Sequence, residues 1–189
     1  MDIDFRELVE KYTSMVYSVA LRMLGNTQDA EDATQETFLS AFKSLKSFRG
    51  QSSLSTWLYR IAVNACLMKL RKEKSAHYLV DTGYEDMDIP DREPGPERAA
   101  INNELREHIQ EGLSRLPPDM RAAVILRDVQ GLSGEEAAEA LGVQLATQKT
   151  RLHRGRVLLR KHLETYLRKA SDTQADDTSG NPERGSRIK

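Results

Sequence analysis

The sequence predicts an all-α protein made of two small helical domains joined by a flexible acidic linker. Apolar residues recur at helical spacing over two stretches, one before residue 75 and one after residue 103. Between these stretches the spacing disappears, while proline, glycine and acidic residues accumulate. The composition agrees with a helical chain, because 39% of the residues are apolar, 30% are charged and only 6% are aromatic.

The N-terminal domain, residues 1–74, is predicted to contain three helices that share enough apolar surface to form one bundle. They cover about residues 5–23, 27–45 and 54–72. Gly25 closes the first helix, because glycine readily adopts the left-handed conformation that follows many helix ends. Asn26 or Thr27 caps the second helix, and a loop over 48–53 precedes the third.

Residues 75–103 form the predicted linker, and residues 170–189 are predicted to be a disordered tail. Within 80–99 there are seven acidic residues against two arginines, so charge repulsion favours an extended segment. The tail is polar and aperiodic, which leaves it too little apolar surface to pack.

The C-terminal domain, residues 104–169, opens with a helix that stops before Pro117. A second helix is predicted from its N-cap Asp119 to Gln130, with Gly131 as its end. Both helices carry apolar residues at helical spacing, so each is expected to contribute to a core.

The sharpest local signal lies within the segment 133–167. Ser133 and Glu136 form a capping box, in which each side chain satisfies a backbone amide of the other residue. Gly142 supplies a short turn, and another helix follows at once. A helix, a glycine-containing turn and a second helix are the sequence signature of a helix-turn-helix.

The second helix of this motif is strongly basic, since residues 141–169 contain eight lysines and arginines against one acid. Lys and Arg neutralise DNA phosphates, and arginine forks and small hydroxyls read base edges in the major groove. A solvated surface helix is the alternative, because basic residues also favour helix C-termini. The preceding capping box and glycine turn favour DNA binding. The candidate residues are Lys149, Thr150, Arg151, His153, Arg154 and Arg156.

The third predicted helix interleaves aromatic and basic residues between Trp57 and Lys72. Stacking groups, cations and a side-chain amide together suit single-stranded or unpaired nucleic acid. The alternative is that Trp57 belongs to the core. We expect it to do so in part, which leaves Arg60 and Asn64 as the informative exposed positions.

The second predicted helix places Asp29, Asp32 and Glu36 on one face, opposite its apolar stripe. A solvated face and an acidic docking face are the two interpretations, because no nucleophile motif accompanies these acids. The four histidines are scattered without metal-ligand spacing, so no metal and no cofactor are expected. The single cysteine, Cys66, excludes an internal disulfide and is expected to be a small buried hydrophobe.

Two stretches of the chain resemble the extracytoplasmic-function (ECF) group of bacterial RNA polymerase sigma factors. They are "DAEDATQETFLSAFKSLKSFRGQSSLSTWLYRIAVNACLMKLRK" (29–72) and "LPPDMRAAVILRDVQGLSGEEAAEALGVQLATQKTRLHRGR" (116–156). The two blocks stand in the order and at the separation that this group shows. The resemblance implies sigma region 2 over residues 1–74 and sigma region 4 over residues 104–169, joined by the linker.

The resemblance also implies three binding surfaces and no catalytic residue. The "DAEDATQETF" helix would bind core RNA polymerase, and the "FRGQSSLSTWLYRIAVN" block would grip the −10 promoter element, with Asn64 beside a flipped base. The helix-turn-helix would read the −35 element, with Arg127 on a phosphate. The implied residues are Asp29, Asp32, Gln35, Glu36 and Phe38 for polymerase, Arg49, Trp57, Arg60 and Asn64 for −10 DNA, and Arg127, Lys149, Thr150, Arg151, His153, Arg154 and Arg156 for −35 DNA.

By the same resemblance, the chain would direct promoter-specific transcription initiation and would not be an enzyme. Its partners would be core RNA polymerase, promoter DNA and an anti-sigma factor, with no small-molecule substrate. No signal-peptide or membrane-span pattern is evident, so a cytoplasmic protein is expected, held at the inner membrane face if its anti-sigma factor is anchored there. The residues alone leave open a stand-alone helix-turn-helix regulator and an interaction protein whose N-terminal bundle sequesters a partner.

Three glutamines depart from the pattern of the ECF group. Gln148 falls between Leu145 and Leu152 on the apolar stripe, where the group commonly has an aliphatic residue. Burying an unpaired amide costs about 1–3 kcal/mol, so the sequence predicts a locally weakened C-terminal domain. Gln144 replaces a small polar N-cap, and Gln51 replaces an acid in the −10 block.

Overall fold

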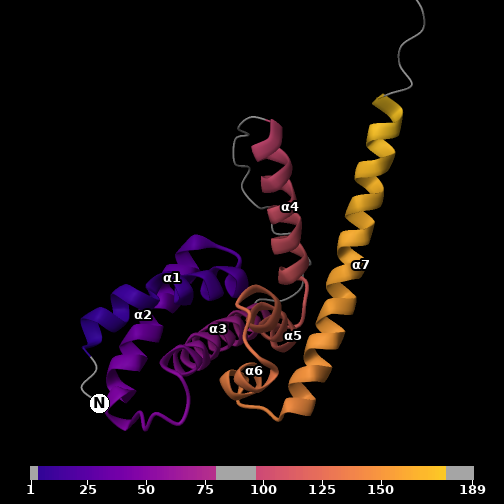
Figure 1. Ribbon diagram of the computed structural model, residues 1–189. Helices are drawn as coiled ribbons and strands as arrows, with labels where there is room; N and C mark the ends of the chain where they lie inside the picture. Colours follow the sequence, from indigo (N-terminus) through magenta and orange to yellow (C-terminus); the bar gives the residue numbers. More distant parts are fainter. Residues whose placement is uncertain (1–3, 80–96, 178–189) are drawn as a thin grey trace, which may run out of the picture.

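The computed structural model describes residues 4–79 and 97–177, and it confirms the all-α fold class, since no strand occurs in these two ranges. Figure 1 shows the three N-terminal helices on one side and the long last helix on the other. No helix in the described ranges combines the length and the hydropathy that a membrane span needs. The helices are α1 (Phe5–Leu24), α2 (Thr27–Ser44), α3 (Leu54–Leu79), α4 (Glu97–Ser114), α5 (Pro118–Val124), α6 (Gly134–Leu141) and α7 (Leu145–Asp177).

The N-terminal bundle of α1, α2 and α3 forms as the sequence predicts. Gly25 ends α1 with a positive φ of 85°, and its amide donates to the carbonyl of Leu21. The side chain of Asn26 then caps α2 by accepting a hydrogen bond from the amide of Asp29 at 2.8 Å. An apolar cluster between the three helices includes Leu8, Val16, Phe38, Ala41, Leu58 and Ala62.

The predicted helix-turn-helix is present as α6 and α7. The Ser133 hydroxyl accepts from the amide of Glu136 at 3.1 Å, and the Glu136 carboxylate accepts from the amide of Ser133 at 2.8 Å. This reciprocal pair is the expected capping box. Gly142 adopts a left-handed conformation (φ 62°) that turns the chain from α6 into α7.

Three helices run further than the sequence predicts. α3 continues to Leu79, α4 already begins at Glu97 within the expected linker, and α7 reaches Asp177 within the expected tail. The added segments contain no glycine or proline, and Pro96 stands just before α4, so each segment can be helical. The rest of the predicted linker and tail lies outside the described residues, at 80–96 and 178–189.

The start of α5 also differs from the prediction. Pro117 takes the N-cap position and Pro118 begins the helix, whereas Asp119 was expected to be the cap. Proline suits this place because the first helical amides have no partner within the helix. Asp119 therefore lies in the first turn, where its carboxylate pairs with Arg151 at 3.1 Å.

The two domains pack directly against each other, which the sequence did not predict. Figure 1 shows α5 and α6 beside α3, and these helices are in contact. One apolar cluster crosses the boundary between the domains. It includes Val19, Met23, Tyr59, Val63 and Cys66 from the N-terminal bundle and Leu113, Ile125, Leu126 and Ala137 from the C-terminal domain.

Arg121 joins the two domains through a buried guanidinium. Its Nη1 donates to the carbonyl of Met23 at the end of α1. Its Nη2 donates to the carbonyls of Ser114 and Leu116, the latter at 3.2 Å. Burial lowers the pKa of Arg121 from its usual value. A cation at helix C-termini also opposes the negative end of each helix dipole.

Two glutamines add polar contacts between the domains. α5 widens into a single π turn (Ile125–Val129), and Gln130 follows it directly. The Oε1 atom of Gln130 accepts from the Tyr59 hydroxyl at 3.1 Å, and its Nε2 atom donates to the Ser18 hydroxyl at 3.3 Å. Gln110 on α4 donates to the carbonyl of Arg22 at 3.2 Å. The domain boundary thus combines an apolar centre with hydrogen bonds to α1 and α3.

Gln148 is buried in the C-terminal domain, with 1% of its surface exposed. Its Nε2 atom lies out of reach of solvent and has no hydrogen-bond acceptor among the described residues. A buried donor without an acceptor lowers the free energy of unfolding, because its hydrogen bonds to water are lost without replacement. The unusual amide noted in the sequence is therefore a local defect in the core.

We predict that Gln148→Val raises the melting temperature of the full chain. Removing an unsatisfied amide is worth about 1–3 kcal/mol, and about 1 kcal/mol corresponds to roughly 2–4 °C in a chain of this size. Gln144→Val is the matched control, because Gln144 is exposed and lies one helical turn before Gln148. Differential scanning calorimetry of both variants checks the prediction, and equal shifts would contradict it.

Candidate nucleic-acid interface

The first half of α7 presents basic side chains to solvent. Lys149, His153 and Arg154 are exposed and form no hydrogen bond or ion pair within the described part of the chain. Thr150 is also exposed, and its hydroxyl donates to the carbonyl of Ala146 at 3.0 Å, which leaves its lone pairs able to accept. These four residues give the helix-turn-helix a polar, cationic face that is available to a ligand.

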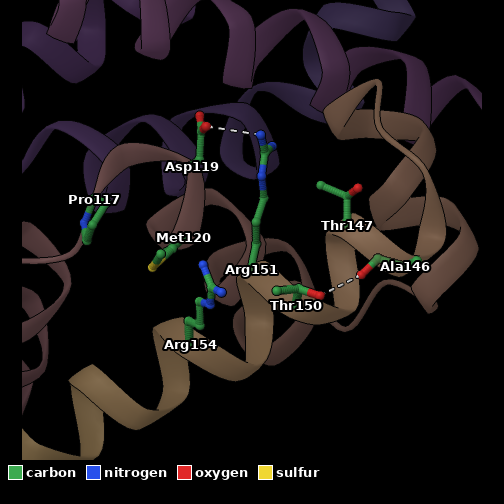
Figure 2. A pocket seen from close by; sticks show the side chains of 8 residues that line it. All are labelled: Pro117, Asp119, Met120, Ala146, Thr147, Thr150, Arg151 and Arg154. Carbon is green, nitrogen blue, oxygen red and sulfur yellow. Dashed lines mark hydrogen bonds and ion pairs between the residues drawn. The ribbon is translucent and has the colours of Figure 1, made fainter.

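A hollow of about 460 Å³ lies between this face and the start of α5. Figure 2 shows Arg151 reaching across it to Asp119, while Thr150 and Arg154 flank it. Arg151 is half-buried and is held by the Asp119 carboxylate at 3.1 Å. Its charge is thus partly neutralised, in contrast to that of Arg154.

Arg127 and Arg156, the other two predicted −35 residues, have partners in the structure. Arg127 is half-buried and donates to the carbonyl of Leu132 in the turn before α6. Arg156 forms two hydrogen bonds to the Asp128 carboxylate, at 2.9 and 2.5 Å, and these raise its pKa. Arg127 thus links the π turn to the turn before α6, and Arg156 links α7 to the π turn.

The −10 candidates Arg60 and Asn64 lie on a face of α3 next to the one that contacts the C-terminal domain. Tyr59 and Val63 are buried against the C-terminal domain, whereas Arg60 and Asn64 are exposed. Trp57 is half-buried, and the centroid of its ring lies 5.0 Å from the centroid of the Phe48 ring. Trp57 therefore belongs partly to the core, as expected.

Arg49 completes the −10 candidates in the loop before α3. It is exposed and directly precedes Gly50, whose φ of 69° is left-handed. The structure therefore leaves Arg49, Arg60 and Asn64 open to solvent. An exposed amide with the guanidinium of Arg60 one turn before it suits an unpaired base and its backbone phosphate.

The acidic face of α2 is partly neutralised by α3. Lys69 pairs with Asp29 at 2.5 Å and with Asp32 at 3.1 Å. The hydrogen bond from Lys69, with a smaller contribution from Asn26, holds the pKa of Asp29 below its usual value. Gln35 and Glu36 remain exposed, so they are the open polar positions on this face.

Phe38 does not lie on the surface to which the sequence analysis assigned it. Its side chain is only 8% exposed and packs in the core of the N-terminal bundle. Leu39 and Phe42 on the same helix are exposed instead, Phe42 to 62%. Leu39 lies about 100° around the helix from Phe38 and therefore points away from the bundle. Phe42 follows Phe38 by one turn on the same stripe, and its ring packs edge-on against that of Phe5, with 5.0 Å between the centroids.

Comparison with protein families defines the class of protein that carries these surfaces. Residues 8–76 match the family model for sigma-70 region 2. Residues 106–159 match the model for sigma-70 region 4. The chain therefore belongs to the sigma-70 family, whose members are the specificity subunits of RNA polymerase.

Individual relatives place the chain in a particular group of that family. It is 40% identical over 161 residues to the ECF RNA polymerase sigma factor SigE of Mycolicibacterium smegmatis, with 85% of this chain and 62% of the relative aligned. It is 38% identical over 165 residues to SigW of Bacillus subtilis, with 84% and 88% aligned. The chain is a member of the ECF group of RNA polymerase sigma factors, and it spans about three fifths of the length of the first relative.

A solved structure shares this architecture over most of its length. The sigma factor RpoE of Bartonella quintana, determined in complex with the anti-sigma factor NepR, superposes with a TM-score of 0.67. The two chains are 26% identical, and the match covers 85% of this chain and 97% of the other. The arrangement of helices described here is thus one that a sigma factor of known structure adopts.

The Lys69 pair predicts an acid dependence of stability. Because the pKa of Asp29 is lowered in the folded chain, the pair stabilises the fold above the unfolded pKa of about 3.9. This stabilisation is lost as pH falls through the lower folded value. In urea unfolding between pH 6 and pH 3, we expect the midpoint of Lys69→Met to fall less with pH than that of the wild type.

Lys43→Met provides the control for this experiment, because Lys43 is exposed on α2 and has no partner within the described ranges. Its midpoint should follow the wild-type pH profile. Parallel profiles for the wild type and Lys69→Met would show that the ion pair contributes nothing to the acid dependence.

Proposed function

We propose that this chain binds core RNA polymerase and directs it to promoters by recognising a −35 and a −10 element. The observation that carries the proposal is the presence of two separate exposed cationic surfaces, one on α7 and one on α3. In this role the chain acts through binding and is not an enzyme. It needs no cofactor and no small-molecule substrate.

The α7 surface suits the −35 element. A helix-turn-helix inserts the start of its second helix into the major groove, where exposed arginine, lysine and hydroxyl groups meet base edges. Lys149, Thr150, His153 and Arg154 occupy that part of α7 and are open. Arg151 would gain a phosphate contact only by exchanging its bond to Asp119. Arg127 and Arg156 would stabilise the helix-turn-helix through their bonds to Leu132 and Asp128.

The α3 surface suits the −10 element once its strands separate. Extruding a base from a duplex costs a few kcal/mol, so a pocket for the extruded base lowers the cost of melting. Asn64 offers both hydrogen-bond donors and acceptors for a base edge, and Arg60 and Arg49 lie open to the strand phosphates. Trp57, whose ring is tilted against that of Phe48, would form the aromatic side of this site.

We place the polymerase contact on the exposed face of α2. Gln35 and Glu36 supply open polar groups there, and Leu39 and Phe42 supply exposed apolar area beside them. Exposed apolar residues next to charged ones are typical of protein interfaces. Asp29 and Asp32 contribute negative charge that Lys69 partly offsets.

Promoter binding would require the two domains to separate. Elements centred at −35 and −10 are about 25 base pairs apart, or ~85 Å at ~3.4 Å per base pair. In the packed arrangement, α6 of the helix-turn-helix lies against α3 itself. The segment 80–96 between α3 and α4 could span at most ~60 Å at ~3.5 Å per residue, so the widths of the two domains would have to cover the rest of the ~85 Å.

We further propose that an anti-sigma factor binds and restrains the chain, by analogy with the RpoE relative, whose structure was determined in complex with the anti-sigma factor NepR. Its binding would compete with polymerase for α2 and α3 or would hold the domains together. The chain would act in the cytoplasm, and a membrane-anchored anti-sigma factor would keep it at the inner membrane face. Gel filtration of the chain with its anti-sigma factor, with and without core polymerase, tests this exclusion.

A run-off transcription assay tests the proposed function directly. Core RNA polymerase with a genomic promoter library should give discrete transcripts only when the purified full chain is added. Binding to duplex DNA without affinity for the core enzyme would instead indicate a stand-alone regulator. Binding to the core enzyme without initiation would indicate an interaction protein.

Asn64→Ala should impair promoter opening without affecting polymerase binding. Loss of one base-reading group costs about 1–3 kcal/mol, so open complexes should decrease about tenfold or more. Permanganate footprinting measures strand opening, and fluorescence anisotropy measures affinity for the core enzyme. Met68→Ala is the matched control, because Met68 is an exposed residue one turn further along α3. An equal loss of opening and core affinity in Asn64→Ala would refute this role.

A further inference from the structure

Two histidines and a glutamate meet where α4 packs against α7, outside every surface assigned so far. The nitrogen and oxygen atoms that His108, Glu111 and His162 can offer to a metal lie within 4.8 Å of one another. The Nδ1 atom of His108 is 3.4 Å from Oε2 of Glu111, and the Nε2 atom of His162 is 3.7 Å from the same oxygen. The fold thus gathers histidines that the sequence analysis regarded as scattered.

The His162 ring is incompletely satisfied. Its Nε2 atom is shielded from solvent and has no hydrogen-bond partner among the described residues. The side chain is only 19% exposed, and the 3.7 Å to Glu111 is too long for a hydrogen bond. A buried ring nitrogen that points at a carboxylate without a hydrogen bond to it is in a position to bind a metal ion together with that carboxylate.

The backbone of α4 is shaped to admit this ring. A Cβ atom on Gly112 would lie 2.9 Å from Cδ2 of His162 and 2.7 Å from Cδ1 of Leu159. Both separations are shorter than carbon atoms tolerate, so a larger residue at position 112 would force Leu159 and the His162 ring to move. Glycine inside a helix costs about 1 kcal/mol relative to alanine, and the close seating of His162 accounts for its presence.

The Glu111 carboxylate is oriented by a neighbour on its own helix. Arg115 donates to Oε1 at 2.5 Å, which leaves Oε2 directed at both histidines. Burial raises the pKa of Glu111, but the combined effect of Arg115, His162 and His108 is larger and brings the pKa below its usual value. The group is therefore a carboxylate at neutral pH, with an outer partner of the kind that orients metal-binding carboxylates.

We propose that His108, Glu111 and His162 bind one divalent transition-metal ion, with Zn²⁺ as the best match. Two imidazoles and one carboxylate are a ligand set typical of zinc sites that keep a fourth position for water. Tetrahedral ligands at ~2.0–2.1 Å from zinc are ~3.4 Å apart, close to the separations of 3.4 and 3.7 Å found here. Binding then needs only small side-chain movements.

A metal at this position would connect α4 to α7. α4 is the first helix after the segment 80–96, and its Gln110, next to Glu111, already bonds to the end of α1. A bound ion would therefore fix the helix that lies between the N-terminal bundle and α7. Occupancy should stabilise the folded chain by an amount that increases with metal concentration.

The test uses the full chain, stripped with a chelator and titrated with Co²⁺ and then Zn²⁺. We expect one Co²⁺ per chain with a visible absorption band that Zn²⁺ removes, and a rise in melting temperature with Zn²⁺. His162→Ala should weaken Zn²⁺ binding at least tenfold in competition with a chromophoric chelator. Glu111→Gln, which keeps the shape of the side chain, should weaken it similarly if His162→Ala proves unstable.

His153→Ala is the control, because it removes an exposed histidine from the same helix without touching the cluster. It should bind Zn²⁺ as the wild type does. The proposal is overturned if the wild type gives no visible Co²⁺ band, or if Glu111→Gln and His153→Ala bind Zn²⁺ equally well. These readouts do not depend on transcription, so they stand apart from the outcome of the run-off assay.

Discussion

The buried guanidinium of Arg121 is the interaction on which the arrangement of the whole chain depends. It donates to the carbonyl of Met23 at the end of α1 and to the carbonyls of Ser114 and Leu116 at the end of α4 and just after it, and thereby joins α1 to the junction between α4 and α5. Removing the side chain would leave these carbonyls without a donor inside the protein, and each such loss costs about 1–3 kcal/mol. The apolar cluster around Met23, Leu113 and Ile125 can form only where these backbones are held together.

This boundary also decides which functional groups are exposed. Tyr59 and Val63 on α3 turn toward the C-terminal domain, whereas Arg60 and Asn64 lie about 100° further around the helix and stay exposed, with the Arg60 guanidinium at the edge of the boundary near Gly142. The contacts of Gln130 with Tyr59 and Ser18 are single hydrogen bonds at 3.1 and 3.3 Å, which water can replace when the domains part. Separation of the domains would also break the bond from Arg121 to Met23 and expose the apolar cluster, so binding to polymerase and promoter DNA would have to supply the free energy that keeps the chain extended.

Features set by neighbouring residues could be predicted from the sequence, whereas features set by distant contacts could not. The capping box of Ser133 and Glu136 and the left-handed Gly25 follow from local backbone chemistry, and both were predicted correctly. The burial of Gln148 could be foreseen from its place on the apolar stripe. Phe38, by contrast, was assigned to the polymerase-binding surface, but it is buried between the three N-terminal helices. Arg121, Gln130 and the His108–Glu111–His162 cluster went unnoticed, because their partners lie up to 112 residues away. A charged residue within "RAAVIL" was the only local sign of the role of Arg121.

The distance between the two domains, in the free chain and on a promoter, tests this arrangement most directly. Spin labels at Lys43→Cys on α2 and Arg160→Cys on α7 would report it, since both positions are exposed. Cys66 should not interfere, because burial raises the pKa of its thiol to about 12 and shields it from the label. Pulsed electron–electron double resonance should give one short distance for the free chain and a clearly longer one in the complex with core polymerase and promoter DNA. The same short distance in an initiation-competent complex would contradict the proposed separation of the domains.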